Sequence, residues 1–208
     1  MLPVMLRDGG PAVWLLLAMS AVMIAAFLER FLHYHRAQIN SFEFLNGIRN
    51  VLKRENLVEA LSICDATPGP VARLVKTAIL NRERGREGVR EALEEAGLQE
   101  VPRLEEKLNF LATVAQIAPL IGLLGTVLGF LDLFQALEAS GPFANTGDLS
   151  SGLRQALLSL AVGLGVSIPA YAGYNYLVTR VNSIVLDMEK ASTEILHLVA
   201  GHATGNGR

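Results

Sequence analysis

The sequence predicts an all-α integral membrane protein with three transmembrane helices, long cytoplasmic extensions and a helical cytoplasmic domain. Two observations support this fold class. The 208 residues are 51% hydrophobic and only 18% charged, with a mean hydropathy of +0.36, whereas a soluble domain carries about 25% charged residues. The shortage of charge is concentrated in three apolar stretches, each long enough to cross about 30 Å of hydrocarbon as a helix.

The first apolar stretch is PAVWLLLAMSAVMIAAFL. It predicts a transmembrane helix at residues 11–29, after a short N-terminal segment at residues 1–10. Pro11 suits the first turn of a helix, and Trp14 suits the membrane interface. A cleaved signal peptide is the alternative, but the run ends in ERFLHYHR rather than in a short polar cleavage region. We therefore expect an uncleaved span.

Two further spans are predicted at residues 108–134 and 153–178, with a periplasmic loop at residues 135–152 between them. The loop contains the turn signals Gly-Pro and Thr-Gly. Two long apolar helices joined by so short a connection must run antiparallel as neighbours. We expect a membrane hairpin.

Basic residues near the span ends predict the orientation. Most of them fall on the side that holds residues 30–107 and 179–208. They are Arg30, Arg36, Arg103, Lys107, Arg180 and Lys190. We therefore expect a periplasmic N-terminus, a cytoplasmic helical domain at residues 30–107, and a cytoplasmic C-terminal helix and tail at residues 179–208.

Within the cytoplasmic domain, apolar residues recur every three or four positions, which predicts amphipathic helices. Helix ends are expected at TPGP and at Gly97. The stretches RLEEKLNFL and RVNSIVLDMEKASTEILHLV are expected to continue the second and third spans inward, and the short helices are expected to pack on them. The acidic residues are expected on solvated faces rather than paired in a buried site. Cys64, the single cysteine, is expected to be a small buried residue.

The hairpin spans also carry small residues and prolines that a lipid-facing helix does not need. Small residues let helices approach closely in lipid, and each proline leaves a backbone carbonyl that a neighbour or water must satisfy. The residues expected at helix contacts are Gly122, Gly125, Gly129, Gly163, Pro119 and Pro169. Plain helix packing and a pore around a central axis both remain open.

Asp132 is different in kind, because a carboxylate inside a span is costly unless it is paired or wet. Counted from the loop, it lies at a depth similar to that of Arg154 and Gln155. A salt bridge to Arg154 and a proton-relay role are both compatible with the sequence.

The hairpin sequences FLATVAQIAPLIGLLGTVLGFLDLFQAL and GLRQALLSLAVGLGVSIPAYAGYNYL closely resemble the MotA/TolQ/ExbB proton-channel family. The three spans are similar to the ExbB/TolQ branch, and LERFLHYHRAQI and ALSICDATPGPVARLV resemble the same family. The resemblance implies a homo-oligomeric ring, a pentamer, around a dimer of a single-span ExbD/TolR-like subunit whose membrane aspartate carries protons. It also implies a bacterial inner-membrane location and transfer of work to a TonB- or TolA-like protein.

Carried over residue by residue, the resemblance places Thr126 of the GTV motif on the pore. Gln155 stands where relatives often have an acid, and Ser159 and Leu160 stand where they have paired threonines. The proton pathway implied for this chain comprises Thr126, Ser159 and Gln155. Asp132 is added as the only carboxylate in the hairpin spans.

The sequence thus predicts a proton-channel or energiser subunit that couples proton-motive force to outer-membrane transport or envelope maintenance. A non-conducting scaffold of the same fold is the alternative, and a membrane enzyme or transporter built around Asp132 and Arg154 is a second. We expect no enzyme activity, cofactor or metal site, because no nucleophile–base pair, phosphate loop or metal-ligand spacing is present. A net charge of −2 gives no sign of a nucleic-acid partner.

Overall fold

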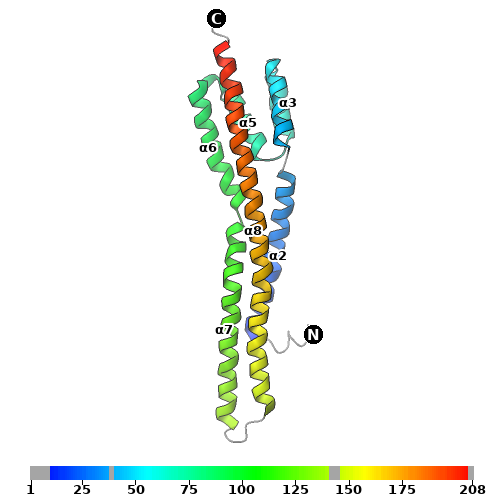
Figure 1. The fold of residues 1–208 in the computed structure, drawn as a ribbon, viewed down its shortest axis with the longest axis vertical. Helices are drawn as coiled ribbons and strands as arrows, with labels where there is room; N and C mark the ends of the chain where they lie inside the picture. The colour runs from blue at the N-terminus through cyan, green and yellow to red at the C-terminus, as the bar shows by residue number, and fades with distance from the viewer. Residues whose placement is uncertain (1–9, 38–39, 141–145, 206–208) are drawn as a thin grey trace. The chain divides into compact units, whose positions relative to one another are not determined.

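The computed structural model describes residues 10–37, 40–140 and 146–205. Within these ranges every regular element is a helix (Figure 1). Three helices are long and apolar enough to cross a membrane. The expected all-α fold with three candidate membrane spans is therefore confirmed.

The three long helices are α2 (Gly10–Ala37), α7 (Leu108–Ser140) and α8 (Thr146–Gly205). The chain divides into two compact units. Unit 1 comprises residues 1–29 and 107–176, and unit 2 comprises residues 30–106 and 177–208.

Unit 1 has a core made by all three long helices. The core residues are small or flexible apolar side chains: Leu16, Met23, Val114, Ala115, Ala118, Val166 and Ala170. Large apolar side chains such as Leu120, Leu124 and Ile168 are exposed on the outside of the same helices. An apolar exterior around an apolar core is what a lipid-embedded helix bundle requires.

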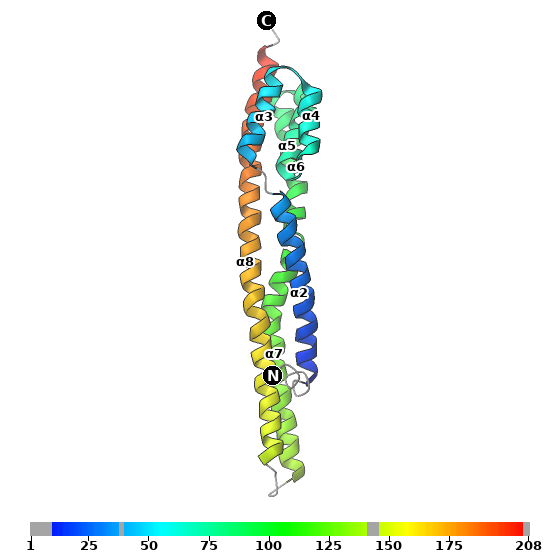
Figure 2. The same ribbon diagram turned by 90° about the vertical axis from the view of Figure 1, so that its right-hand side faces the viewer.

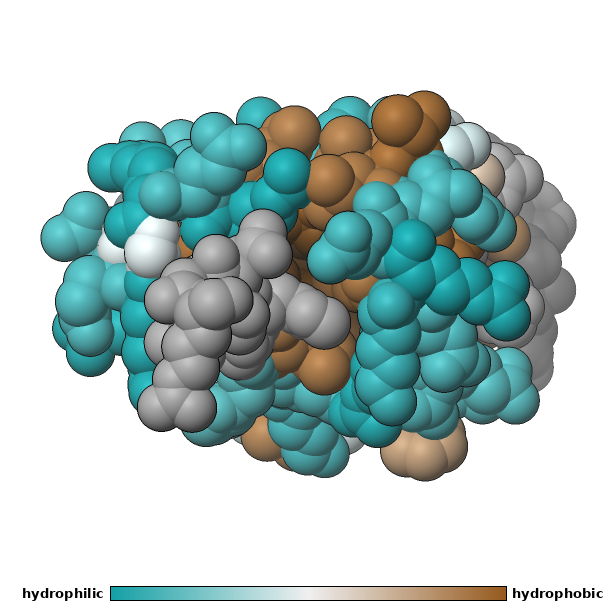
Figure 3. Space-filling view, turned by 90° about the horizontal axis from the view of Figure 1, so that it is seen from above, coloured by the Kyte–Doolittle hydropathy of each residue, from teal (hydrophilic) through white to brown (hydrophobic). Residues whose placement is uncertain are grey.

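Unit 2 contains the short helices and the C-terminal part of α8 (Figure 2). The short helices are α3 (Ser41–Lys53), α4 (Leu57–Ala66), α5 (Pro70–Leu80) and α6 (Gly85–Glu105). Their apolar stripes are buried and their charged faces are exposed. Figure 3 shows hydrophilic residues over most of the face seen from above, with hydrophobic residues visible between them. Cys64 is buried, as the sequence predicted.

Local sequence sets where the short helices begin. The side chains of Asn40 and Asn56 accept hydrogen bonds from the backbone N–H groups of Glu43 and Glu59, which caps α3 and α4. Gly69 has a φ of 116°, in the left-handed region that favours glycine, and it precedes the first residue of α5.

The short helices pack on the inward extension of the third span, as expected. Arg49 of α3 forms an ion pair with Glu194 of α8. Helix α8 also buries apolar side chains at Ile184, Met188 and Ile195 within unit 2. The C-terminal part of α8 is therefore a structural member of unit 2.

The helix end predicted at Gly97 is wrong. Helix α6 continues through Gly97 and Pro102 to Glu105. Glycine costs only about 1 kcal/mol in a helix interior, and the buried side chains of Val89, Leu93 and Leu104 anchor α6 on both sides of it.

The predicted continuity of RLEEKLNFL is also wrong. Glu106 leaves the helical conformation with a ψ of 137°, and Lys107 has a φ of 66°. Helix α7 then starts afresh at Leu108. A left-handed residue cannot continue an α-helix, so the two helices are separate elements.

The connection within the hairpin is shorter than expected. Helix α7 extends to Ser140, and α8 begins at Thr146. Thr146 and Gly147, which the sequence predicted to form a turn, therefore lie in α8. The other predicted turn, Gly141-Pro142, lies outside the described residues.

Candidate functional site

A close helix contact in unit 1 joins Gly122 of α7 to Gly163 of α8. A Cβ added to Gly163 would lie 2.8 Å from the Gly122 Cα and 2.7 Å from the Ala118 carbonyl oxygen. Both obstacles are backbone atoms, which cannot turn aside. The absence of a side chain therefore sets the distance between the two helices here.

A second close contact lies towards the hairpin end. A Cβ at Gly129 would lie 2.8 Å from the Ala156 backbone nitrogen, and one at Gly152 would lie 3.1 Å from the Leu133 Cβ. Together with the first contact, these form a seam of small residues between α7 and α8. The seam supports a packing role for Gly122, Gly129 and Gly163.

Gly125 lies where α2 meets the hairpin. A Cβ there would lie 2.6 Å from the Ser159 Cβ and 2.9 Å from the Ala12 Cβ. Ser159 is only 1% exposed, and its hydroxyl donates to the Gln155 carbonyl at 3.0 Å. Ser159 thus lies inside the three-helix contact and not on the surface that a single chain presents.

Thr126 is half-buried and uses its hydroxyl at the contact between α7 and α8. The Oγ1 atom lies 3.0 Å from the Gly122 carbonyl oxygen and 3.2 Å from the Ala156 carbonyl oxygen. Because Ala156 belongs to the facing helix, the Thr126 hydroxyl can alternate between a partner in its own helix and one across the seam.

Asp132 lies beside Gln155 at the start of α2. The Gln155 side-chain amide donates to the Asp132 carboxylate at 3.3 Å. The same amide nitrogen would lie 2.7 Å from a Cβ placed on Gly10, the first residue of α2. The structure therefore brings Asp132, Gln155 and the beginning of α2 together.

The proposed pathway residues do not form one cluster. Asp132 follows Gly125 by seven residues, so both lie on the side of α7 that faces α2. Thr126 lies about 120° away from Asp132 around the helix, since successive residues turn by about 100°. On α8, Leu160 is turned from Gln155 by about 140°. The hairpin thus has one flank with Asp132 and Gln155 and a second flank with Thr126 and Leu160.

Pro119 has a specific partner in the facing helix. A proline at this position cannot donate the helix hydrogen bond to the carbonyl four residues earlier, that of Ala115. The Ser167 hydroxyl donates to this carbonyl at 2.6 Å. Ser167 therefore supplies the donor that Pro119 lacks. Pro169, in α8, is exposed.

Replacing Ser167 with alanine is expected to destabilise unit 1 by about 1 kcal/mol, because the Ala115 carbonyl would lose its donor inside an apolar bundle. The midpoint of thermal unfolding in detergent measures this. Thr113→Ala is the matched control, since the Thr113 hydroxyl bonds only the Asn109 carbonyl within its own helix. In a Pro119→Ala background the cost of Ser167→Ala should fall; an unchanged cost would contradict the proposed pairing.

Unit 2 contains a buried carboxylate, Glu100, paired with two exposed arginines, which the sequence did not indicate. Glu100 is 6% exposed. It accepts hydrogen bonds from Arg73 at 2.6 Å and from Arg103 at 3.3 Å. The expectation that the acidic residues lie only on solvated faces is therefore wrong. The reason is that Glu100 and Arg73 lie 27 residues apart, on two different helices. The periodicity of apolar residues does not reveal that these two helices pack together.

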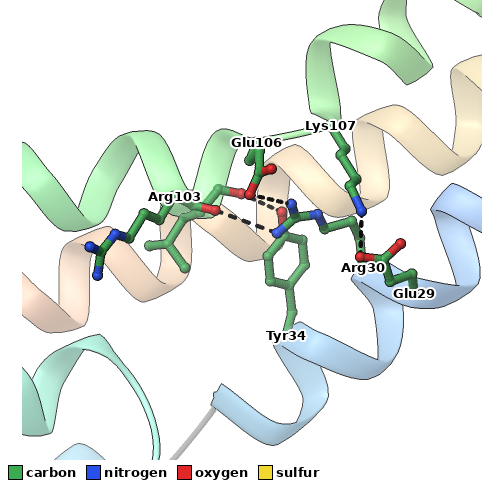
Figure 4. Close-up of polar contacts among 7 residues, drawn as sticks. Glu29, Arg30, Tyr34, Arg103, Glu106 and Lys107 are labelled. Carbon is green, nitrogen blue, oxygen red and sulfur yellow. Dashed lines mark hydrogen bonds and ion pairs between the residues drawn. The ribbon is translucent and has the colours of Figure 1, made fainter.

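The C-terminal end of α6 is capped by side chains of α2 (Figure 4). In unit 2, Arg30 donates to the Arg103 carbonyl at 3.4 Å and pairs with Glu106 at 2.8 Å. The Tyr34 hydroxyl donates to the Leu104 carbonyl. These donors satisfy carbonyls that a helix end leaves without partners.

In unit 1, the Lys107 ammonium lies 2.5 Å from a Glu29 carboxylate oxygen (Figure 4). Arg30, Arg103 and Lys107, which the sequence marked only as orientation signals, are thus also structural residues. Within the described residues, no three His, Cys, Asp or Glu side chains gather closely enough to hold a metal ion.

The fold and the glycine seam define a class of protein: a polytopic membrane protein whose hairpin carries polar groups at tight helix contacts. A model of the MotA/TolQ/ExbB proton channel family matches residues 66–190, more than half of the chain. The chain belongs to this family.

Named relatives agree with this assignment. The chain is 27% identical to a biopolymer transport protein ExbB homolog of Methanothermobacter thermautotrophicus, over 89% of this chain and 66% of that protein. It is 37% identical to the Tol-Pal system protein TolQ of Haemophilus influenzae, over 57% of this chain and 51% of that protein. It is 45% identical to the biopolymer transport protein ExbB of Aquifex aeolicus, over 41% of this chain and 57% of that protein. The matches thus span about half to two thirds of the length of these relatives.

Proposed function

We propose that the chain is the proton-channel subunit of an ExbB/TolQ-like inner-membrane motor that couples proton-motive force to outer-membrane transport or envelope maintenance. The observation that carries the proposal is the family match across the glycine-packed hairpin that holds Thr126. The relatives named for biopolymer transport and for the Tol-Pal system support the same activity class.

The active assembly in this proposal is a pentameric ring around a dimer of a single-span ExbD/TolR-like subunit, which passes work to a TonB- or TolA-like protein. The N-terminus is periplasmic and the C-terminus cytoplasmic, following the distribution of basic residues. Support for a ring comes from the exposed apolar side chains of α7 and α8, which lipid, neighbouring copies or a partner helix would have to cover.

In the ring, the flank with Thr126 and Leu160 faces the axis. This choice is supported by the position of α2, which covers the other flank near Gly10 and Ala12. Thr126 then lies at the pore with a hydroxyl that can exchange partners. Ser159 supports the pathway from inside the bundle, because it is buried.

A non-conducting scaffold of the same fold is the second candidate. It is favoured by Gln155, which cannot titrate near neutral pH, and by Leu160, which cannot hydrogen-bond to water. Both replace residues that the family resemblance would make polar or acidic. If the chain conducts protons, the group that takes up and releases them must therefore be the partner subunit's carboxylate or Asp132.

The experiment that tests the proposal begins with deletion of the gene that encodes the chain in the source organism. Loss of a proton-motive-force-dependent envelope process is expected, with recovery when the gene is restored. Affinity purification of the restored protein should also recover a single-span membrane protein with one membrane aspartate. An unchanged envelope phenotype, or purification without such a partner, would contradict the proposal.

Replacing Asp132 with asparagine separates the roles that remain open for this carboxylate. A proton relay predicts a normally assembled oligomer whose proton flux is at least about tenfold lower, equivalent to about 1.4 kcal/mol in the barrier. A structural ion pair predicts weakened assembly instead. Size-exclusion chromatography and flux into liposomes read out the two effects, and Asp132→Glu, which keeps the charge, is the control. Normal assembly with normal flux would exclude both roles.

A further inference from the structure

The chain breaks between α6 and α7 although its local sequence favours one continuous helix there. The segment RLEEKLNFL is rich in arginine, leucine, glutamate and lysine, which are good helix formers. Only Glu106 and Lys107 separate the two helices. Neither is a residue that usually ends or caps a helix. Pro102 does not impose the break, because α6 continues beyond it to Glu105.

Lys107 has a backbone conformation that is unfavourable for a residue with a side chain. Its φ of 66° lies in the left-handed region, where the Cβ of an L-residue crowds the backbone. The Lys107 carbonyl still accepts a hydrogen bond from the Leu111 N–H at 3.3 Å, in the first turn of α7. Such a conformation persists only where the surrounding structure holds it. The break therefore depends on tertiary contacts.

The Tyr34 hydroxyl supplies one of these contacts in unit 2. It donates to the Leu104 carbonyl (Figure 4), and Tyr34 is only 3% exposed. In an α-helix, each carbonyl accepts from the N–H group four residues later. In a continuous helix the Leu104 carbonyl would therefore accept from the Leu108 N–H. The Tyr34 hydroxyl occupies the acceptor that this helix would use.

Arg30 does the same one residue earlier. Its guanidinium donates to the Arg103 carbonyl at 3.4 Å, where a continuous helix would place the Lys107 N–H. Arg30 also pairs at 2.8 Å with Glu106, whose ψ of 137° lies outside the helical region. Arg30 is 5% exposed. Two buried side chains of α2 thus stand in for two consecutive backbone donors.

The remaining contact at the break is weak. In unit 1, Lys107 pairs with Glu29, but the two side chains are 39% and 58% exposed. An ion pair so open to water contributes little to stability. The break is therefore held mainly by two side-chain donors that backbone donors could replace, against the preference of the local sequence for a helix.

We propose that the junction of α6 and α7 is a conformational switch controlled by α2. In one state, Arg30 and Tyr34 hold the break. In the other, α6 and α7 form one continuous helix, and the N–H groups of Lys107 and Leu108 replace those two donors. The inference concerns the single chain and goes beyond the proposed function, so its failure would leave that function standing.

A pair of histidines placed across the junction tests the switch. Two histidines four residues apart bind a metal ion when the chain between them is helical, because both then lie on one face. Glu105→His/Asn109→His places such a pair at exposed positions across the break. Glu91→His/Glu95→His is the matched control at exposed positions inside α6. Electron paramagnetic resonance titration with Cu²⁺ measures both affinities in the full-length protein in detergent, and single-histidine variants give the background.

The junction pair is expected to bind Cu²⁺ at least about tenfold more weakly than the control pair, since apparent affinity falls with the fraction in the binding state. Adding Tyr34→Phe removes one competing donor and should raise the junction affinity by about threefold or more. The control pair should be unchanged, which also verifies the fold. Equal affinities of the two pairs would mean that the break is absent in solution. That result, or a junction affinity that Tyr34→Phe leaves unchanged, would overturn the proposal.

Two variants of Lys107 test the same switch without altering α2. Lys107→Ala and Lys107→Gly both remove the ammonium that pairs with Glu29. Alanine favours the continuous helix, whereas glycine favours the left-handed conformation of the break. The junction pair is expected to bind Cu²⁺ at least about tenfold more tightly with alanine than with glycine. Equal binding in the two variants would show that the break does not exchange with a helix and would overturn the proposal.

Discussion

Replacing Gly163 with leucine is expected to prevent α7 and α8 from closing into a hairpin and to abolish assembly. The added Cβ alone would lie 2.8 Å from the Gly122 Cα and 2.7 Å from the Ala118 carbonyl oxygen. Only a shift of a whole helix relieves contacts with backbone atoms. We expect a loss of about 3 kcal/mol or more, the upper end for overpacked sites. Thermal unfolding in detergent and size-exclusion chromatography measure both effects.

Gly165→Leu is the matched control, because a Cβ at Gly165 meets no atom within 4 Å in the same chain. The alanine pair gives a graded version of the test. Gly163→Ala should be destabilised, whereas Gly165→Ala should be neutral or slightly stabilised, since alanine is the better helix former. Equal stability of the two alanine variants would show that the seam between Gly122 and Gly163 does not set the helix distance.

Replacing Thr126 with valine is expected to leave the oligomer intact and to lower proton flux by about tenfold or more. Valine keeps the shape of threonine but removes the hydroxyl that reaches the Gly122 and Ala156 carbonyls. A tenfold loss corresponds to about 1.4 kcal/mol in the barrier, which one lost hydrogen bond to the moving charge can supply. Flux is measured in liposomes with a pH-sensitive dye and a potassium diffusion potential.

Two controls separate a proton role from packing. Thr126→Ser keeps the hydroxyl and should conserve most of the flux. Thr113→Val removes a hydroxyl from the same helix that bonds only within that helix, and it should conduct normally. Full flux through Thr126→Val would remove this residue from the pathway.

The spans and the small-residue contacts were predictable because both follow from local spacing. Gly122 and Gly129 are seven residues apart, which places them on one face of a helix, and the structure shows that face against α8. The need of the Ala115 carbonyl for a partner also followed from Pro119 alone. That Ser167 meets this need did not, since it depends on the register of α8 against α7.

The parts that sequence reasoning missed depend on pairs far apart in the chain or on a single backbone angle. From the sequence, Glu100 is expected to be a solvated acid, whereas in the structure α5 places Arg73 beside it. Lys107 is expected to be helical from its sequence, but its φ of 66° shows that the helix is broken there. The sequence marks Arg30 only as a signal of membrane orientation, although its side chain also caps α6.

The division of the candidate site into two flanks was partly accessible from spacing. Thr126 and Asp132 are six residues apart, which places them on different sides of one helix. What spacing could not show is the location of α2, because Gly10 and Ala12 meet the hairpin through tertiary contacts. Those contacts place Gln155 and Asp132 on the flank that α2 covers.

Proton flux through the purified complex distinguishes a proton channel from a scaffold. The chain and the single-span subunit that co-purifies with it are reconstituted into liposomes, and an inward potential is imposed. We expect flux that requires both proteins and falls with Thr126→Val. A stably assembled complex that passes no protons would contradict it and would identify the chain as a scaffold.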